Sequence, residues 1–265
     1  MSVLVTGLYV PGDRPDRFDK AVATGADLVI LDLEDAVAPS RKSYARDAVT
    51  SWLADTTTNC VLQVRVNAGD AGDLAALRGM TGFEVRLPKV SSAAEIDTVA
   101  AALPGAPLTA LIESALGVER AAEVAAHPAV TRLGLGESDL ASELGTRADA
   151  VLDHARVRLL YAALAADLPA PMLSAYPDIK DLVGLRADTD RGRTLGWVGR
   201  VAVHPSQLPV IAEAFRPSDT ESRWARQVLA AGTQGGVSTL PNGEMVDAAM
   251  LGRARAILAR THHNH

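Results

Sequence analysis

Short apolar runs alternate with longer stretches of helical periodicity along most of the chain. The apolar runs are rich in Val, Ile and Leu, and their length and composition are typical of buried strands. Several of the intervening segments begin with Ser, Asp or Pro, which are favoured where helices start. The predicted strands are Val5–Val10, Asp27–Leu33, Cys60–Val66, Phe83–Leu87, Leu108–Ile112, Arg132–Gly136, Met172–Ala175 and Arg200–Val203. The predicted helices are Arg14–Thr24, Ser40–Leu53, Ala71–Gly79, Ala93–Leu103, Leu116–Ala126, Ala148–Ala166, Ile179–Leu195 and Ser206–Ala214.

This regular alternation predicts an α/β protein with a parallel sheet. Eight strand–helix units in succession are typical of a closed (β/α)8 barrel, or TIM barrel, which commonly forms a single domain of roughly 250 residues. We therefore interpret residues 1–215 as a barrel domain. A doubly wound open sheet, which has the same alternation, is the alternative.

The segment after the barrel, residues 216–260, has a different pattern. Pro217 and Ser218 are predicted to begin a helix that ends at Gly232, and a glycine-rich connection separates it from a last helix beginning at Asp247. Two helices joined by a glycine hinge favour a lid or an oligomerisation segment, although they could simply cover the barrel. The last five residues, 261–265, read as a tail.

Polar residues gather just after the predicted strands, whereas the strand starts carry mostly Ala, Thr or Pro. Active sites of (β/α)8 barrels lie at the carboxyl ends of the strands, because the loops that follow the strands meet there. The sequence therefore predicts a functional site at that face. The polar residues after successive strands are Glu34 and Asp35, Arg65 and Asn67, Lys89, Glu113, Glu137 and Asp139, Tyr176 and Asp178, and His204.

The stretch LGLGESDLASELG, Leu133–Gly145, is the most distinctive of these strand ends. Gly134 and Gly136 leave the backbone bare, which would let a ligand approach closely. Three carboxylates follow and suggest a hard cation, although acids at a helix N-terminus that complement its dipole would explain them as well. The three carboxylates are those of Glu137, Asp139 and Glu143.

Two carboxylates at the ends of adjacent strands, Glu113 and Asp139, could bind one metal ion. Because no Cys or His is obviously near them, an all-oxygen site for Mg²⁺ is favoured. Arg65 would place a planar cation beside that ion, which would polarise a carbonyl and stabilise the enolate formed when a C–C bond breaks. Arg65 could also pair with Glu34 or Asp35 to balance charge inside the barrel, and the two roles are compatible.

The composition narrows the class of partner. The chain has 32 acidic and 26 basic residues, so the totals indicate no basic face for nucleic acid or for an anionic membrane, and we expect a small-molecule partner. The single cysteine, Cys60, cannot form an internal disulfide, which fits a reducing cytoplasm. The N-terminal segment lacks the charge and the unbroken apolar run of a signal peptide or membrane span. A cytoplasmic location is expected.

Eight motifs, in order along nearly the whole chain, resemble the HpcH/HpaI aldolase and citrate lyase β-subunit (CitE-like) family, and within it the acyl-CoA lyase branch. The motifs are LYVPGDRPDRFDKA, DLEDAVAPSRK, VRVN, LPKV, LIESALGV, GESDLASELG, VHPSQLPVI and GEMVDAAML. The resemblance implies a Mg²⁺-containing TIM barrel with a C-terminal lid, assembled as a homotrimer or hexamer. It also implies reversible cleavage of citryl-, malyl- or citramalyl-CoA to acetyl-CoA and a 2-keto acid.

The resemblance also implies roles for residues of the site. Glu113 and Asp139 would be the metal ligands, and Arg65 would contact the carbonyl or enolate oxygen of the substrate. The amides of Ser138 and Asp139 would hold the carboxylate of the keto acid. Glu34 and Asp35 would orient Arg65 and the waters on the metal.

For coenzyme A, the resemblance implies contacts with Tyr9, Arg14 and Lys20, and phosphates suit the two basic side chains. Lys89 would meet a phosphate or stabilise the barrel, since the family uses a metal rather than a Schiff base. Asp247 would lie on the lid of a neighbouring subunit and exchange a proton with the methyl carbon of acetyl-CoA. From the pattern alone Asp247 is a helix N-cap.

The sequence departs from the usual family motif at GESD, where Ser138 lies between two acids that are adjacent in many relatives. It is therefore open which residue of the relatives corresponds to Glu137, whereas Asp139 keeps its place before Leu140.

Two alternative functions remain open. One is a CoA-independent aldolase of 4-hydroxy-2-keto acids, and the other is a noncatalytic acyl-CoA-binding subunit.

Overall fold

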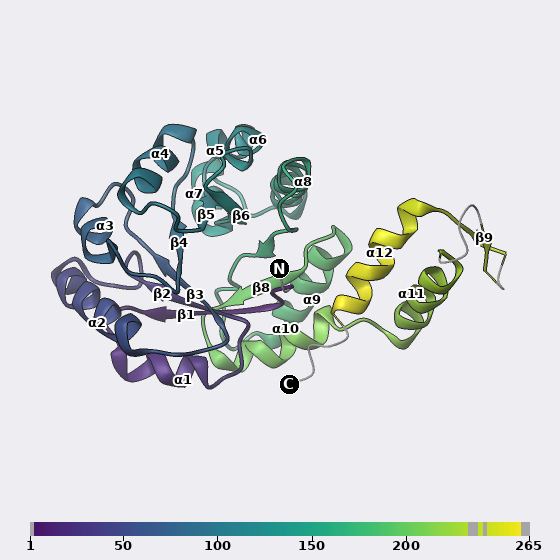
Figure 1. Cartoon of the computed structure of the whole chain (residues 1–265), viewed down its shortest axis with the longest axis horizontal. Coiled ribbons are helices and arrows are strands. Elements are labelled where there is room, and N and C mark those ends of the chain that lie inside the picture. Colours follow the sequence, from purple (N-terminus) through teal and green to yellow (C-terminus); the bar gives the residue numbers. More distant parts are fainter. Residues whose placement is uncertain (1–2, 233–237, 241–242, 261–265) are drawn as a thin grey trace.

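Eight parallel strands close into a barrel in the order β1 to β8, with helices around the outside (Figure 1). The computed structural model describes residues 3–232, 238–240 and 243–260. The closed order, in which β8 pairs with β1, confirms the predicted (β/α)8 barrel and excludes the open sheet. The strands are β1 Thr6–Pro11, β2 Leu28–Asp32, β3 Val61–Arg65, β4 Glu84–Leu87, β5 Leu108–Ile112, β6 Val130–Leu135, β7 Met172–Leu173 and β8 Gly199–Ala202.

The helices between the strands lie where they were predicted, but several are divided or differ in their bounds. The helices predicted at Arg14–Thr24, Ser40–Leu53 and Ser206–Ala214 each consist of a short 3₁₀ helix followed by an α-helix. The predicted helix Leu116–Ala126 is two short helices, α5 and α6, because the backbone of Arg120 leaves helical geometry between them. A separate helix, α7, begins directly after β6 and was not among the predicted helices. Glu137 and Asp139 lie in its first turn, in agreement with the alternative interpretation of these acids as residues at a helix N-terminus. The barrel helices are η1 Pro15–Arg17, α1 Phe18–Val22, η2 Pro39–Arg41, α2 Lys42–Asp55, α3 Ala71–Leu77, α4 Ala93–Ala102, α5 Ala115–Glu119, α6 Ala121–Ala125, α7 Glu137–Leu144, α8 Asp149–Ala165, α9 Leu182–Thr194, η3 Pro205–Gln207 and α10 Leu208–Phe215.

The main apolar core lies between the outer faces of the strands and the helices. The interior of the barrel is different, because buried polar side chains occupy its middle layers. Gln63 of β3, for example, donates from Nε2 to Glu84 Oε2 and to Thr109 Oγ1, each at 2.8 Å. A smaller apolar cluster that includes Leu28 and Ile30 packs separately from the main core. The barrel interior therefore combines buried polar side chains with a small apolar cluster.

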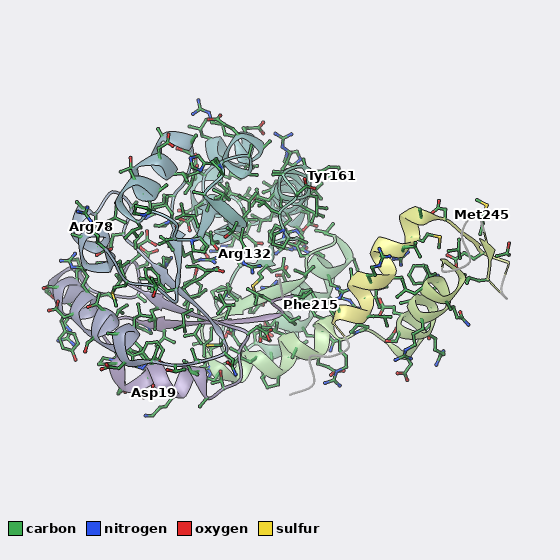
Figure 2. The ribbon with its side chains drawn as sticks, viewed as in Figure 1. Asp19, Arg78, Arg132, Tyr161, Phe215 and Met245 are labelled. Atoms are coloured by element: carbon green, nitrogen blue, oxygen red, sulfur yellow. The ribbon has the colours of Figure 1, made fainter. Side chains whose placement is uncertain are left out.

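The C-terminal segment consists of α11, Asp219–Gly232, and α12, Ala248–Ala259, with the short strands β9, Ser238–Thr239, and β10, Met245–Val246, between them. The two helices pack on each other and bury their own apolar cluster. They extend away from the barrel, and Met245 lies at the far end of the segment (Figures 1 and 2). The cluster contains Ala225, Val228, Leu240, Val246, Ala254 and Ile257.

One ion pair ties this segment to the barrel. Arg193 of α9 contacts Glu221 of α11 at 2.6 Å. Part of the predicted glycine-rich connection, at 233–237 and 241–242, and the predicted tail 261–265 lie outside the described residues. Within the described ranges, every helix is too short or too polar to cross a membrane.

Candidate active site

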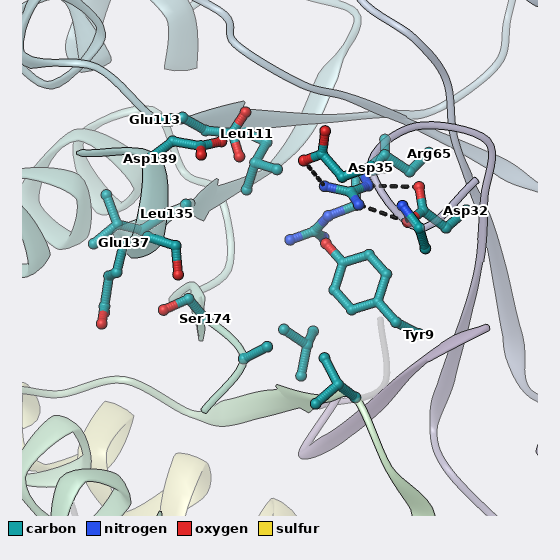
Figure 3. A pocket seen from close by; sticks show the side chains of 17 residues that line it. Tyr9, Asp32, Asp35, Arg65, Leu111, Glu113, Leu135, Glu137, Asp139 and Ser174 are labelled. Carbon is teal, nitrogen blue, oxygen red and sulfur yellow. Dashed lines mark hydrogen bonds and ion pairs between the residues drawn. The ribbon is translucent and has the colours of Figure 1, made fainter. Parts of the chain in front are cut away.

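A cavity of about 380 Å³ lies where the strands end, as the barrel prediction requires. Seven polar residues selected from the sequence line it, most of them labelled in Figure 3. Two residues that were not selected, Asp32 and Arg86, line it as well. The selected residues that line the cavity are Tyr9, Asp35, Arg65, Glu113, Glu137, Ser138 and Asp139.

Glu113 and Asp139 face the same space in this cavity (Figure 3). Glu113 follows β5, is only 6% exposed, and accepts a hydrogen bond at Oε2 from the backbone N–H of Lys89 at 2.9 Å. A Cβ atom at position 136 would lie 2.2 Å from Glu113 Oε1, so any side chain here would displace the Glu113 carboxylate. Asp139 lies in the first turn of α7. The bare backbone at Gly136 thus makes room for a carboxylate of the protein itself.

The electrostatics of this pair suit a divalent cation. Burial, with smaller contributions from the nearby charges of Glu34 and Asp139, raises the pKa of Glu113 to about 7. Within the described part of the chain, neither Glu113 nor Asp139 forms an ion pair with a Lys or Arg side chain, and there is no cluster of three or more His, Cys, Asp or Glu able to hold a metal. Mg²⁺ fits a pair of carboxylates, because it fills its remaining positions with water and substrate oxygens.

Arg65, the last residue of β3, is held by a carboxylate that sequence reasoning missed. Its Nε and Nη2 atoms donate to the two oxygens of Asp32 at 2.7 and 2.6 Å. Nη1 lies 2.9 Å from Glu34 Oε2 and 3.6 Å from Asp35 Oδ2. Although burial opposes its charge, the hydrogen bonds to Asp32 hold the pKa of Arg65 above its ordinary value, so the guanidinium remains charged.

Lys89 has an unusual backbone conformation, with φ of 57°. This left-handed geometry is uncommon for a residue with a side chain, and the N–H of Lys89 donates to Glu113. The Lys89 side chain contacts Glu34 Oε1 at 3.1 Å. Burial raises the pKa of Glu34, and the charges of Arg65 and Lys89 oppose that rise. Lys89 therefore holds two carboxylates in place.

The backbone at the start of α7 is open to an anion. The helix begins after Gly136, which has no side chain with which to cap the first turn. The first N–H groups of a helix have no partner within it, and they bind carboxylates and phosphates well. Ser138 and Asp139 lie in this turn and line the cavity.

The residues expected to contact coenzyme A are not all brought together. Tyr9 of β1 lies inside the cavity, and its ring centroid is 5.0 Å from the guanidinium carbon of Arg65. Arg14 and Lys20 lie on the segment after β1, are exposed, and do not line the cavity. Arg14 instead forms two hydrogen bonds of 2.9 Å with Asp16.

Asp247 lies at the N-terminus of α12, where its side chain accepts a hydrogen bond of 3.2 Å from the N–H of Met250. It is thus an N-cap, as the pattern alone suggested, and it does not line the cavity of its own chain.

Glu137, whose role was left open, is held away from the carboxylate pair. Its oxygens lie 2.7 and 2.9 Å from Nε and Nη2 of Arg156, a side chain that is 1% exposed. Arg156 also contacts Asp188 at 3.1 Å. Glu137 therefore neutralises a buried arginine of α8.

This pairing predicts different effects on stability and on metal binding. We expect Glu137→Gln to lower the free energy of unfolding by about 2–3 kcal/mol, because part of the charge of Arg156 becomes uncompensated. We expect the affinity for Mg²⁺ to change less than about threefold, since the Glu113–Asp139 pair is untouched. Chemical denaturation and calorimetric Mg²⁺ titration measure the two effects. Glu143→Gln is the control, and loss of Mg²⁺ binding in Glu137→Gln would make Glu137 a ligand.

Comparison with known proteins places these features in a family. A family model described as HpcH/HpaI aldolase/citrate lyase matches residues 5–205. The chain is 36% identical to a (3S)-malyl-CoA thioesterase of Cereibacter sphaeroides, over 96% of this chain and 93% of that protein. It is 39% identical to a citrate lyase subunit beta-like protein of Mycobacterium tuberculosis, over 96% of this chain and 94% of that protein.

Solved structures agree with this result. The fold is similar to that of protein CitE from Mycobacterium tuberculosis in complex with magnesium, acetoacetate and coenzyme A, with a TM-score of 0.83 and 36% identity, covering 98% of each chain. The family model spans nearly all of the barrel, and the relatives align along almost the full length. The family predicted from the eight motifs is therefore confirmed. This chain belongs to the HpcH/HpaI aldolase/citrate lyase family.

Proposed function

We propose that the protein is a Mg²⁺-dependent carbon–carbon lyase that reversibly cleaves a 3-hydroxyacyl-CoA of the citryl-, malyl- or citramalyl-CoA type. Its products would be acetyl-CoA and a 2-keto acid. The observation that carries the proposal is the Glu113–Asp139 pair, which forms no ion pair with a Lys or Arg side chain among the described residues and opens on the same cavity as Arg65. One relative is named as an L-malyl-CoA/beta-methylmalyl-CoA lyase, and the CitE structure contains magnesium and coenzyme A, which supports the same chemistry here.

In the proposed reaction, Arg65 holds the oxygen of the 3-hydroxyl group. Two of its five N–H groups donate to Asp32, and Nη1 also lies 2.9 Å from Glu34 Oε2, which leaves donors on Nη1 and Nη2 for the substrate. Mg²⁺, held by Glu113 and Asp139, would supply Lewis-acid stabilisation of the developing negative charge. As the bond between C2 and C3 breaks, the hydroxyl proton passes to water, the hydroxyl oxygen becomes the carbonyl oxygen of the keto acid, and the electron pair of the broken bond passes to the thioester enolate. Protonation of C2 then gives acetyl-CoA.

The remaining contacts follow from the positions of the side chains. The amides of Ser138 and Asp139 would bind the keto-acid carboxylate at the uncapped start of α7. Tyr9 would contact the acyl-CoA within the cavity. Arg14 and Lys20 would bind phosphates of coenzyme A, with Arg14 exchanging its contact with Asp16 for a phosphate.

The proton donor to C2 is assigned to Asp247 from a neighbouring subunit. In its own chain Asp247 lies on a segment that extends away from the barrel (Figure 1), so it would reach a cavity only in another copy. A homotrimer or hexamer with α11 and α12 as lids would provide this arrangement. A cytoplasmic location agrees with the unpaired Cys60.

A second candidate is hydrolysis of the acyl-CoA, because one relative is a (3S)-malyl-CoA thioesterase aligned over 96% of this chain. Water would then attack the thioester carbonyl, and free coenzyme A and the hydroxy acid would be released. The difference between lyase and thioesterase is visible in the products.

The test uses purified protein, Mg²⁺ and acetyl-CoA with glyoxylate, pyruvate or oxaloacetate in separate reactions. We expect mass spectrometry to detect a condensed acyl-CoA with one of the keto acids, and we expect EDTA to abolish its formation. Free coenzyme A and a hydroxy acid as the only final products would favour the thioesterase.

Two other outcomes would contradict the proposal. Cleavage of a 4-hydroxy-2-keto acid without coenzyme A would favour the CoA-independent aldolase. Binding of acyl-CoA without any turnover, in a folded and Mg²⁺-loaded protein, would favour the noncatalytic subunit.

A further inference from the structure

A second arginine lies in the active-site cavity beside Arg65. Arg86 is the register partner of Arg65 on the adjacent strand β4. It is only 5% exposed, and it lines the same cavity. Both guanidinium groups lie against the ring of Tyr9, with their Cζ atoms 5.0 and 5.6 Å from its centroid. Two buried positive charges therefore share one aromatic neighbour.

The two arginines differ in their counter-charges. Arg65 contacts the carboxylates of Asp32 and Glu34. Among the described residues, Arg86 donates one hydrogen bond, from Nη1 to the neutral Oε1 of Gln63 at 3.2 Å, and its buried Nε atom has no hydrogen-bond partner there. No carboxylate of the described residues forms an ion pair with Arg86, so its charge is buried without a compensating acid. Such a group binds an anion strongly, because the cost of removing it from water has already been met in folding.

Gly134 of β6 and Gly136, just after this strand, show where this charge lies. A Cβ atom at position 134 would be 3.0 Å from Arg86 Nη2, whereas one at position 136 would meet Glu113. The two positions are separated by two residues of a strand, which is about 6.6 Å. Arg86 therefore lies one layer deeper in the barrel than the metal-binding carboxylate. A substrate held at Glu113 and Asp139 would extend its far end toward Arg86.

We propose that Arg86 is a specificity-determining residue that binds a second carboxylate on the keto-acid part of the substrate. The inference rests on the proposed lyase function and selects, among its keto acids, a dicarboxylic one. A guanidinium group with free N–H donors can bind a carboxylate through two parallel hydrogen bonds. A keto acid that ends in hydrogen or methyl would leave this charge unpaired, so it would bind and react less well.

The test separates binding from turnover. Malate and lactate differ by one carboxylate, and calorimetry with Mg²⁺ measures the affinity of each for the intact protein. We expect the wild-type protein to bind malate about 30-fold more tightly than lactate, which is a typical effect for a charged hydrogen-bonded pair. We expect Arg86→Gln to reduce this ratio to within about threefold and to leave the affinity for lactate unchanged. Arg86→Lys should keep part of the preference.

Turnover provides the second readout. We expect Arg86→Gln to lower kcat/KM for oxaloacetate about 100-fold and to change kcat/KM for glyoxylate or pyruvate less than threefold. Equal losses for both classes of keto acid, or a wild-type protein without preference for malate, would overturn the inference. If Arg86→Gln fails to fold, the malate-to-lactate ratios of the wild-type and Arg86→Lys proteins decide the question. An Arg86-dependent preference for malate without any lyase product would instead overturn the proposed function alone.

Discussion

Replacing Glu113 with glutamine is expected to abolish Mg²⁺-dependent turnover and, at the same time, to make the metal-free protein more stable. Glutamine has nearly the same shape but no charge, and Mg²⁺ prefers carboxylate oxygens. Loss of the ion would remove several kcal/mol of transition-state stabilisation, so kcat should fall at least about a thousandfold.

The gain in stability follows from the raised pKa of Glu113. In the metal-free protein this pKa is about 7, whereas the ordinary value is 4.5. The folded state therefore holds the proton more tightly than the unfolded state, and the protein loses stability as the pH rises from 4.5 through 7. The loss at pH 8 is on the order of 3 kcal/mol. Glutamine removes it, so the variant should be more stable than the wild type above pH 7 and similar to it near pH 4.5.

Denaturant unfolding with EDTA at several pH values measures this difference, and calorimetry measures Mg²⁺ binding. Mg²⁺ should stabilise the wild type but not Glu113→Gln. Glu123→Gln, which changes an exposed acid on α6, should affect neither quantity. A Glu113→Gln protein that retains more than a tenth of the activity would remove Glu113 from the metal-binding residues.

The strands were predictable because each is a short apolar run with clear ends. β5 was predicted at its observed bounds, since Pro107 precedes the run and Glu113 follows it. β7 is shorter than predicted, because only Met172 and Leu173 pair with the neighbouring strands. The closed barrel was predicted from the number of strand–helix units alone, without any knowledge of side-chain contacts.

The site was predicted less completely, for a geometric reason. Reasoning from the sequence selected polar residues after the strands, and these include Glu113 and Asp139. Asp32 and Arg86 lie within strands, among apolar neighbours, where a charge is easily taken for an isolated exception. In a barrel the alternate residues of a strand point inward, so a charge between two apolar residues near the end of a strand is the signal that would have found both.

The role of Glu137 and the use of the space beside Gly134 and Gly136 depend on tertiary contacts, which the spacing of residues along the sequence cannot show. Glu137 follows the same strand as Asp139, yet Arg156 from α8 holds it, and no local pattern predicts that ion pair. Gly134 and Gly136 suggested close approach by a ligand, whereas the structure fills the space above them with Arg86 and Glu113. In both cases a partner distant in sequence determines the role.

Replacing Arg65 with lysine is the second change with a large expected effect. An ammonium group cannot donate in parallel to both oxygens of Asp32 and also reach Glu34, as the guanidinium does. The positive charge would therefore no longer be fixed where negative charge develops on the substrate oxygen. Because such a preorganised donor is worth about 10²–10³ in rate, we expect kcat to fall by about that factor.

The same geometry predicts that Asp32 acts through Arg65. Asp32→Asn keeps one acceptor but loses the charge-assisted pair, so we expect a smaller fall in kcat, of about 10- to 100-fold. Combining Asp32→Asn with Arg65→Lys should cost little more than Arg65→Lys alone, since both changes disturb one unit. Steady-state kinetics of the four proteins, with Arg158→Lys as an exposed arginine control, tests this coupling. Additive losses would mean that Asp32 and Arg65 act independently, and more than a tenth of the activity in Arg65→Lys would exclude its guanidinium from the reaction.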